Sequence, residues 1–128
     1  MNQLRKSVLV ADDELYVQRI LEFGLTLKGY LTILASNGTE AIESYRQNHP
    51  DAVVLDTVMP GTSGFDAARA IREYETAQGK KPVPIVMLGS AETKRQQAFD
   101  SGATDFMAKP FSPGVLYESL SRQLSDGQ

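Results

Sequence analysis

Residues 53–64, with the sequence VVLDTVMPGTSG, decide the fold of this chain. Residues 53–55 form a short apolar run that is typical of a strand buried on both faces of a parallel sheet. Pro60 and Gly61 then end the strand and turn the chain. Asp56 therefore stands at the carboxyl end of a central strand, the edge at which open α/β sheets bind ligands. An acid in this place is a cation ligand, a nucleophile or a helix cap.

Strand-like and helix-like segments alternate along the whole chain. The predicted strands are residues 7–11, 30–35, 53–55, 84–88 and 104–108, and the predicted helices are residues 14–28, 39–48, 64–78, 92–101 and 113–124. This alternation predicts an α/β fold, a flavodoxin-like doubly wound domain. Right-handed crossovers then favour a five-stranded parallel sheet of order 2-1-3-4-5 with five helices.

Helical spacing of apolar residues indicates which faces of the first and last helices are buried. In the last helix, Ser112 is typical of an N-cap and Pro113 of the first helical position. The residues expected on the inner faces of these two helices are Val17, Ile20, Leu21, Gly24, Leu27, Val115, Leu116, Leu120 and Leu124.

Length and composition indicate one globular domain. The chain has 128 residues, of which 41% are hydrophobic and 23% charged, and we expect a single domain over residues 1–128 with a core of about 7–124. It contains no cysteine, which excludes disulfides and fits a cytoplasmic location. A net charge of -3 with scattered Lys and Arg argues against direct nucleic-acid binding. No apolar run approaches the ~20 residues that span a bilayer, so we expect no membrane contact.

Charged residues follow three of the predicted strands directly. Asp12 and Asp13 come after the first strand, Asp56 after the third, and Lys109 after the fifth. Because parallel strands present their carboxyl ends at one edge of the sheet, we expect three carboxylates and one ammonium to meet there. Pro110 follows Lys109 and is a candidate for a cis peptide bond that orients this loop.

Three carboxylates in one crevice repel each other unless a cation lies among them. A hard divalent ion held by carboxylates, carbonyls and waters is the pattern of Mg²⁺. Softer ligands are missing from this edge, because the chain has no cysteine and His49 precedes the central strand, at the opposite edge. Asp56 would then be a nucleophile that accepts a phosphoryl group. Taken singly, residues 12–14 are more often a solvated helix start, and Lys109 is more often a surface lysine.

Together these motifs resemble the receiver domain of two-component response regulators, of the chemotaxis-regulator-like type. The matching segments are residues 12–13 (DD), 55–64 (LDTVMPGTSG), 102–106 (GATDF) and 109–111 (KPF), and the similarity covers residues 7–124. The resemblance implies a phosphorelay signalling domain that takes a phosphoryl group from a histidine kinase or phosphotransfer protein. It is a phosphoacceptor and no enzyme in the usual sense, since it catalyses only its own phosphorylation and slow dephosphorylation.

The resemblance also assigns roles to individual residues. Three carboxylates and the backbone carbonyl of Val58 would bind Mg²⁺, Asp56 would be the phosphoacceptor, and Lys109 would contact the phosphoryl group. Phe106 stands where the family keeps an aromatic residue that changes rotamer on activation. The output surface would be the last two helices with the fifth strand between them. The cognate kinase, the downstream target or output domain, and a homodimer through these helices are left open.

Gly89 departs from the family pattern. The fourth strand of a receiver usually ends in Ser or Thr, whose hydroxyl binds the phosphoryl group, but here Gly89 falls on that position and Ser90 comes one residue later. Consecutive strand residues face opposite ways, so either Ser90 acts through a rearranged loop or the switch contact is missing. Val58 and Ala91 would flank the attacking water without hydrogen-bonding to it, which predicts slow dephosphorylation.

Two other functions remain as alternatives at this point. The first is a pseudo-receiver, an interaction module without regulated phosphorylation, which Gly89 supports and the full set of acids with Lys109 opposes. The second is an aspartyl phosphatase of similar fold, which generally has a second acid two residues after its nucleophile, where this chain has Val58. Mg²⁺ binding and a phosphatase assay would separate the three.

Overall fold

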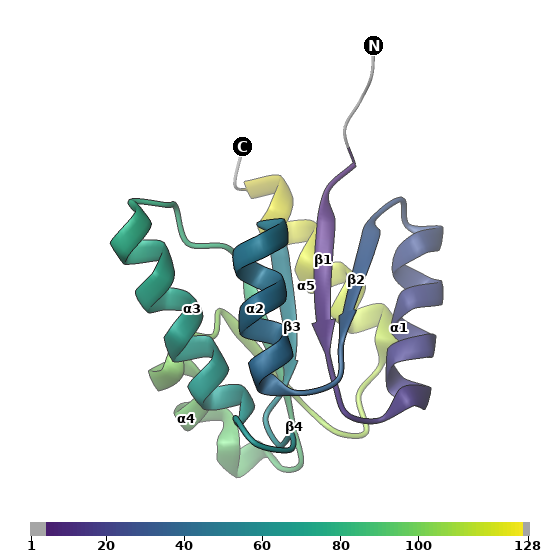
Figure 1. The fold of residues 1–128 in the computed structure, drawn as a ribbon. Coiled ribbons are helices and arrows are strands. Elements are labelled where there is room, and N and C mark those ends of the chain that lie inside the picture. The colour runs from purple at the N-terminus through teal and green to yellow at the C-terminus, as the bar shows by residue number, and fades with distance from the viewer. Residues whose placement is uncertain (1–4, 127–128) are drawn as a thin grey trace.

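The structure is a computed structural model and describes residues 5–126. Five parallel strands form one sheet in this part of the chain. The strands are β1 (Ser7–Ala11), β2 (Leu31–Ala35), β3 (Ala52–Asp56), β4 (Ile85–Gly89) and β5 (Asp105–Ala108). Their order in the sheet is β2-β1-β3-β4-β5 (Figure 1). This order confirms the fold class predicted from the alternation of segments.

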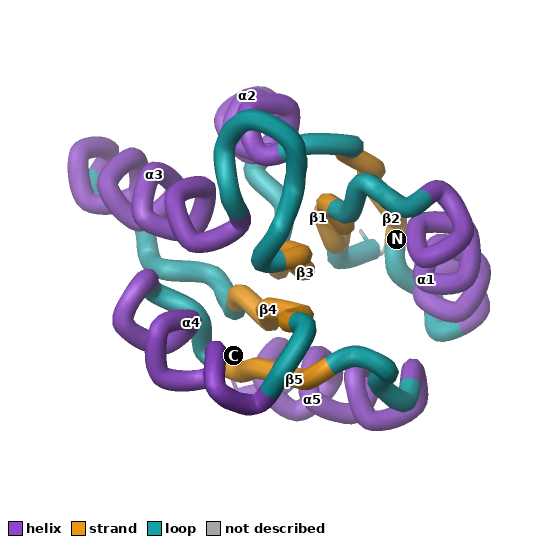
Figure 2. Tube along the Cα trace, turned by 90° about the horizontal axis from the view of Figure 1, so that it is seen from below, coloured by secondary structure: helices purple, strands orange, loops and turns teal. Residues whose placement is uncertain are grey.

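Helices cover both faces of the sheet. They are α1 (Leu15–Leu27), α2 (Gly38–Asn48), α3 (Gly64–Gln78), α4 (Arg95–Ser101) and α5 (Pro113–Asp126), and a short 3-10 turn, η1 (Glu92–Lys94), precedes α4. Helices α1 and α5 pack on one face, and α2, α3 and α4 on the other (Figures 1 and 2). The helix predicted over residues 92–101 is thus divided between η1 and α4.

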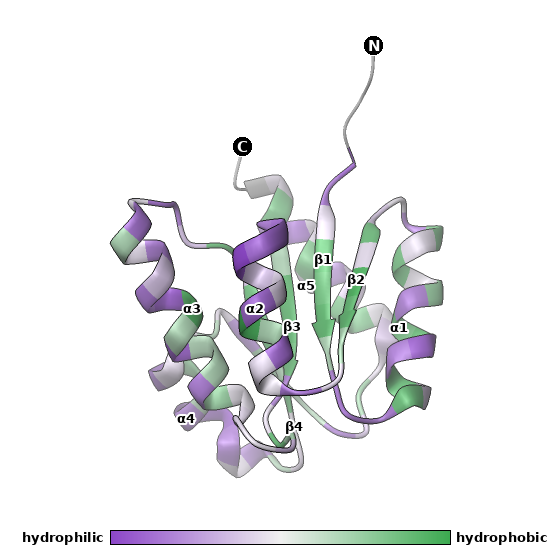
Figure 3. Cartoon of the chain, viewed as in Figure 1, coloured by the Kyte–Doolittle hydropathy of each residue, from purple (hydrophilic) through white to green (hydrophobic). Residues whose placement is uncertain are grey.

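The three central strands are buried on both faces, as their continuous apolar runs predicted. Successive residues of a strand point to opposite faces, so Val8 and Val10 of β1 join the core beneath α1 and α5. Leu9 and Ala11 join the core beneath the other three helices. Figure 3 shows the resulting concentration of hydrophobic residues along the strands, and a further set on α1.

Helix α1 buries only part of the predicted face. Val17, Leu21 and Leu25 lie against the sheet, whereas Ile20 is 39% exposed and Leu27 is 71% exposed. The prediction for Ile20 and Leu27 was wrong because α1 is apolar on two sides, and spacing alone does not say which side meets the sheet. The second apolar side therefore remains at the surface.

Helix α5 follows the prediction at three of four positions. Leu116, Leu120 and Leu124 are buried, but Val115 is 52% exposed. The three buried residues form one row with a spacing of four, and Val115 lies about 100° around the helix from Leu116. The prediction that Val115 faces inward was therefore wrong.

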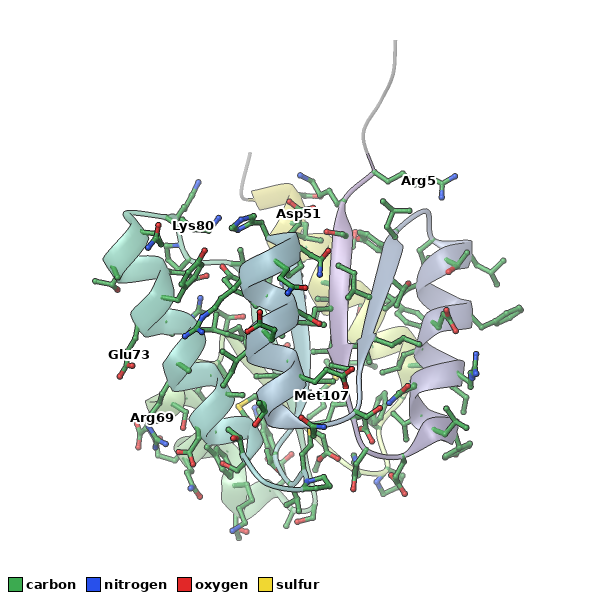
Figure 4. All side chains as sticks on the ribbon, viewed as in Figure 1. Arg5, Asp51, Arg69, Glu73, Lys80 and Met107 are labelled. Carbon is green, nitrogen blue, oxygen red and sulfur yellow. The ribbon has the colours of Figure 1, made fainter. Side chains whose placement is uncertain are left out.

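The amino edge of the sheet is polar and lies at the opposite end from the predicted site. Asp51 accepts a hydrogen bond from the Ser7 amide at 2.8 Å and ties the starts of β1 and β3 together. Arg5 and Lys80 lie near the same end, and Arg69 and Glu73 project from the outer side of α3 (Figure 4). No helix within residues 5–126 has the length and apolar character that crossing a membrane requires.

Candidate functional site

The carboxyl edge of the sheet gathers the charged residues that follow β1, β3 and β5 (Figure 2). One carboxylate oxygen from each of Asp12, Asp13 and Asp56 lies within 4.8 Å of the other two. The Lys109 ammonium lies 3.2 Å from Asp56 Oδ2 and 3.4 Å from Asp12 Oδ2. Residues that are far apart in the sequence thus form one cluster of three acids and one base.

The backbone after β3 holds the Asp56 carboxylate in place. Thr57 N donates to Leu88 O at 2.9 Å, which extends the pairing with β4, and Gly64 N donates back to Thr57 O at 3.0 Å. A Cβ on Gly64 would lie 2.0 Å from the Asp56 carbonyl oxygen, so only glycine permits this close approach. Val58 N donates to Asp56 Oδ1 at 3.2 Å and orients the carboxylate.

Gln18 was not identified from the sequence, although it supports Asp12. Its side-chain amide, 5% exposed, donates to Asp12 O at 2.6 Å and to Ala35 O at 3.3 Å. Asp12 Oδ1 in turn accepts from Glu14 N at 2.9 Å. The signal that could have revealed Gln18 is a polar residue on the side of α1 that also carries the buried Leu21.

Glu14 is a third carboxylate partner of Lys109. Glu14 Oε1 lies 3.6 Å from Lys109 Nζ, and the Glu14 side chain is 59% exposed. The sequence indicated Glu14 only as part of a helix start. The Lys109–Pro110 peptide bond is cis, in agreement with the expectation for this loop.

Burial and repulsion disfavour charge on the acids of this cluster. Burial, and after it the neighbouring Asp12 carboxylate, raise the pKa of Asp56 to about 6, and Lys109 only partly opposes this. Burial likewise raises the pKa of Asp12. Burial disfavours the Lys109 ammonium too, but Asp56 and Asp12 together raise the pKa of Lys109. The single ammonium therefore does not balance the three carboxylates, and a further cation would relieve the repulsion.

The donor atoms of the cluster fit a hard divalent cation. Carboxylate oxygens from three side chains, one of them the exposed Asp13, converge closely enough to share one ion. Mg²⁺ prefers such oxygen ligands and retains several waters, which the exposed side of the cluster admits. The role of the Val58 carbonyl as a further ligand remains a prediction.

The residues of the predicted switch lie beside this cluster. Gly89 is the last residue of β4, and Ser90 is exposed directly after it. Phe106 is 2% exposed, and its ring fills the space next to Gly89. The sequence placed Gly89 and Ser90 at the end of the fourth strand and Phe106 within the fifth, but it did not indicate the contact between Phe106 and Gly89.

Comparison with known proteins agrees with this geometry. The model of the family described as the response regulator receiver domain matches residues 8–121. The transcriptional regulatory protein ResD of Bacillus subtilis is 41% identical over 108 residues, which are 83% of this chain and 42% of ResD. The chain spans less than half the length of the curated relatives it matches.

Two solved structures share both the fold and part of the sequence. The receiver domain of the sensor histidine kinase PA1611 of Pseudomonas aeruginosa, which has a magnesium ion in its active-site cleft, is 28% identical with a TM-score of 0.84, covering 95% of this chain and 99% of that one. A co-crystal structure of the Saccharomyces cerevisiae phosphotransfer protein Ypd1 and the Ssk1 receiver domain contains a chain that is 27% identical with a TM-score of 0.89, covering 94% of this chain and 90% of that one. The chain therefore belongs to the family of response regulator receiver domains, the signalling domains of two-component systems.

Proposed function

We propose that this receiver domain accepts a phosphoryl group on Asp56. The observation that carries the proposal is the position of the Asp56 carboxylate, which clusters with the Asp12 and Asp13 carboxylates and has the Lys109 ammonium 3.2 Å from its Oδ2 atom. The carboxylates of Asp12, Asp13 and Asp56, with the backbone carbonyl of Val58, are the proposed ligands of Mg²⁺. This arrangement of acids and lysine argues against the alternative of an interaction module without phosphorylation, because such a module has no use for mutually repelling carboxylates.

The proposed reaction is a substitution at phosphorus. A carboxylate oxygen of Asp56 forms a bond to the phosphorus atom, and the bond from phosphorus to the donor imidazole nitrogen breaks with its electron pair leaving on the donor. Bound Mg²⁺ would supply charge neutralisation for the phosphoryl oxygens. Lys109 faces Asp56 Oδ2 and would turn its ammonium to a phosphoryl oxygen once the negative charge arrives. The domain then catalyses its own phosphorylation and acts on no other substrate.

The donor is proposed to be a histidine kinase or a histidine phosphotransfer protein, and α1 offers a surface for it. Five large apolar side chains on α1 are exposed, and four of them follow a helical spacing: Tyr16 (70%), Ile20 (39%), Phe23 (68%) and Leu27 (71%). Their spacing of four, three and four residues places them along one side of the helix, and we call this set the α1 stripe. Exposed apolar surface of this extent is typical of a docking site for another protein.

The α1 stripe runs up to the acidic cluster. A surface hollow at its N-terminal end is lined by Tyr16, Ile20, Pro110 and Phe111 together with Lys109, the residue that contacts Asp56. A donor helix with an apolar face that packs along this stripe would bring its histidine to the rim of the cluster. The complex of Ypd1 with the Ssk1 receiver domain shows that a related domain binds a phosphotransfer protein.

The phosphorylated form is proposed to be long-lived. Val58, 65% exposed, and the exposed Ala91 follow the ends of β3 and β4, beside the phosphoacceptor. Neither side chain can donate or accept a hydrogen bond, so neither can orient the water that hydrolyses an aspartyl phosphate.

Location and output are also proposed, with the relatives as support for the location. ResD is named as a transcriptional regulatory protein, and such proteins work where the DNA is, so we propose a cytoplasmic location for this domain. The downstream partner is proposed to be a protein or output domain that reads the surface of α4, β5 and α5.

Intact-protein mass spectrometry after incubation with acetyl phosphate tests the proposed function. A phosphoryl adduct should form with Mg²⁺ on the wild-type protein, and should be missing without Mg²⁺ or in Asp56→Asn. Asp100→Asn, which changes an exposed acid of α4, is the matched control and should give the adduct. The proposal is wrong if the folded wild-type protein gives no adduct with Mg²⁺, or if Asp56→Asn still gives one.

A further inference from the structure

Gly89 and the ring of Phe106 share one space. A Cβ on residue 89 would lie 2.6 Å from Cε1 and 2.7 Å from Cζ of Phe106, and 3.5 Å from Cγ2 of Thr57. Distances of 2.6 Å between carbon atoms are far inside van der Waals contact. The ring can therefore hold its present position only because residue 89 has no side chain.

The outer side of the ring is also covered. The Arg95 guanidinium lies over the Phe106 ring, with Cζ 5.3 Å from the ring centroid. Glu92 fixes this guanidinium through two hydrogen bonds, from Arg95 Nε at 2.8 Å and from its terminal nitrogen at 3.1 Å. A cation over an aromatic face is an attractive contact, so Arg95 and Glu92 favour the inward ring from the surface side.

The space beside Gly89 borders the phosphoacceptor. Thr57, whose methyl group faces this space, directly follows Asp56, and its amide donates to Leu88 of β4 at 2.9 Å. A side chain on residue 89 would stand between the acidic cluster and the Phe106 ring and could transmit a displacement from one to the other. Gly89 leaves no such group, and the Phe106 ring occupies the space in its place.

We propose that Phe106 keeps this inward position whatever the phosphorylation state of Asp56. The surface formed by α4, β5 and α5 then has the same conformation at Phe106 before and after phosphoryl transfer, and a partner that reads this surface binds both forms. This inference rests on the proposed function, because it concerns what phosphorylation of Asp56 fails to change. The contact between Gly89 and Phe106 then depends on which residue stands at position 89 and does not depend on phosphorylation.

Nuclear Overhauser effects from the Phe106 ring protons test the proposal directly. Cross-peaks to the Gly89 Hα protons and to the Thr57 methyl group should appear in the protein with Mg²⁺ alone. The same cross-peaks should remain after phosphorylation with acetyl phosphate. Loss of either set on phosphorylation overturns the proposal. The mass of the same sample reports separately whether Asp56 has accepted the phosphoryl group, so a failure of the proposed function is recognised by itself.

Two substitutions test the steric basis of the contact. Gly89→Ala should expel the ring and remove its cross-peak to Thr57, because the clashing atoms are the far end of the Phe106 side chain. Gly114→Ala, where the added Cβ would lie at an ordinary contact distance of 3.8 Å from Ser112 Oγ, is the matched control and should keep the cross-peak. A retained cross-peak in Gly89→Ala shows that residue 89 does not control the ring and overturns the proposal.

Phe106→Leu provides a second background in which the clash is missing, since leucine has no counterpart of Cε1 and Cζ. Gly89→Ala should lower the midpoint of thermal unfolding in the wild-type background and leave it unchanged in the Phe106→Leu background. An equal fall in both backgrounds means that the two residues do not share a space, and the proposal is then wrong.

Discussion

Lys109 Nζ lies 3.2 Å from Asp56 Oδ2, although the two residues are 53 positions apart in the sequence. The ammonium lies between the Asp56 and Asp12 carboxylates and reaches Glu14 as well. It supplies the positive charge that partly offsets the repulsion between the buried acids. A phosphoryl group on Asp56 would add negative charge at this point, so Lys109 is the first side chain expected to respond.

Replacement of this lysine should slow phosphoryl transfer. We expect Lys109→Ala to reduce the rate of adduct formation by roughly 100-fold at saturating Mg²⁺, because preorganised charge at the reacting group is then missing. The rate is measured by intact mass with acetyl phosphate. Lys81→Ala, at an exposed loop position, is the control and should react as the wild type does. Equal rates for Lys109→Ala and Lys81→Ala would contradict the assigned role.

The raised pKa of Asp56 makes the metal-free protein sensitive to pH. The pKa of Asp56 is about 6 in the folded protein, against an ordinary value of 3.8, so the folded protein binds this proton more tightly than the unfolded chain does. The contribution of Asp56 to stability is therefore fully present below pH 3.8 and is lost as pH rises through about 6. Asp56→Asn removes the buried charge, and it should increase the free energy of unfolding at pH 8 by about 1–3 kcal/mol. At pH 3.5 the gain should disappear. Urea unfolding without divalent ions measures both values, and a loss of stability at pH 8 would refute the explanation.

Mg²⁺ should stabilise the folded protein by binding only the assembled cluster. At a free concentration of 100 times the dissociation constant, the free energy of unfolding should rise by about 2.7 kcal/mol. The rise should be absent in Asp12→Asn, and it should decline in the wild type as pH falls below about 6, where protons compete for Asp56. Thermal unfolding with MgCl₂, against NaCl of equal ionic strength, measures it. Equal stabilisation by the two salts would exclude the metal site.

Polar side chains beside the phosphoacceptor should shorten the life of the phosphorylated form. In Val58→Asn and Ala91→Glu, the new side chain can hydrogen-bond to the attacking water. We expect each change to speed dephosphorylation about tenfold. The rate is followed as loss of the phosphoryl adduct by mass after removal of acetyl phosphate. Unchanged decay in both variants would show that these positions do not limit hydrolysis.

Loss of the Gln18 side-chain amide should weaken the support of Asp12. In Gln18→Met, the Asp12 and Ala35 carbonyl oxygens lose a buried donor, and the free energy of unfolding should fall by about 1–3 kcal/mol. The concentration of Mg²⁺ needed for half-maximal stabilisation should rise as well. Gln47→Met, on the exposed side of α2, is the control for the change of residue type. If Gln18→Met matches this control in both measurements, Gln18 has no positioning role.

Much of this site could be predicted from the sequence because its chemistry lies at the ends of parallel strands. The alternation of segments determined the sheet, and the sheet brings whatever follows β1, β3 and β5 to one edge. Asp12, Asp13, Asp56 and Lys109 could be named in advance for this reason. The exposed side of α1 could not be predicted, because the helix is apolar on two sides and the spacing of its apolar residues does not tell which side packs on the sheet.

The sequence by itself determined the class of fold and the charged residues of the site, because these depend on periodicity and on local strand ends. The handedness of the crossovers favoured the observed strand order without fixing it. Only the tertiary structure decided how Phe106, Gly89 and Gln18 are used. The ring of Phe106 fills the volume that Gly89 leaves empty, and the amide of Gln18 reaches the carbonyl group of Asp12, directly after β1, and that of Ala35 at the end of β2. Such contacts join separate segments across the core, and their distances depend on how the helices and strands pack together.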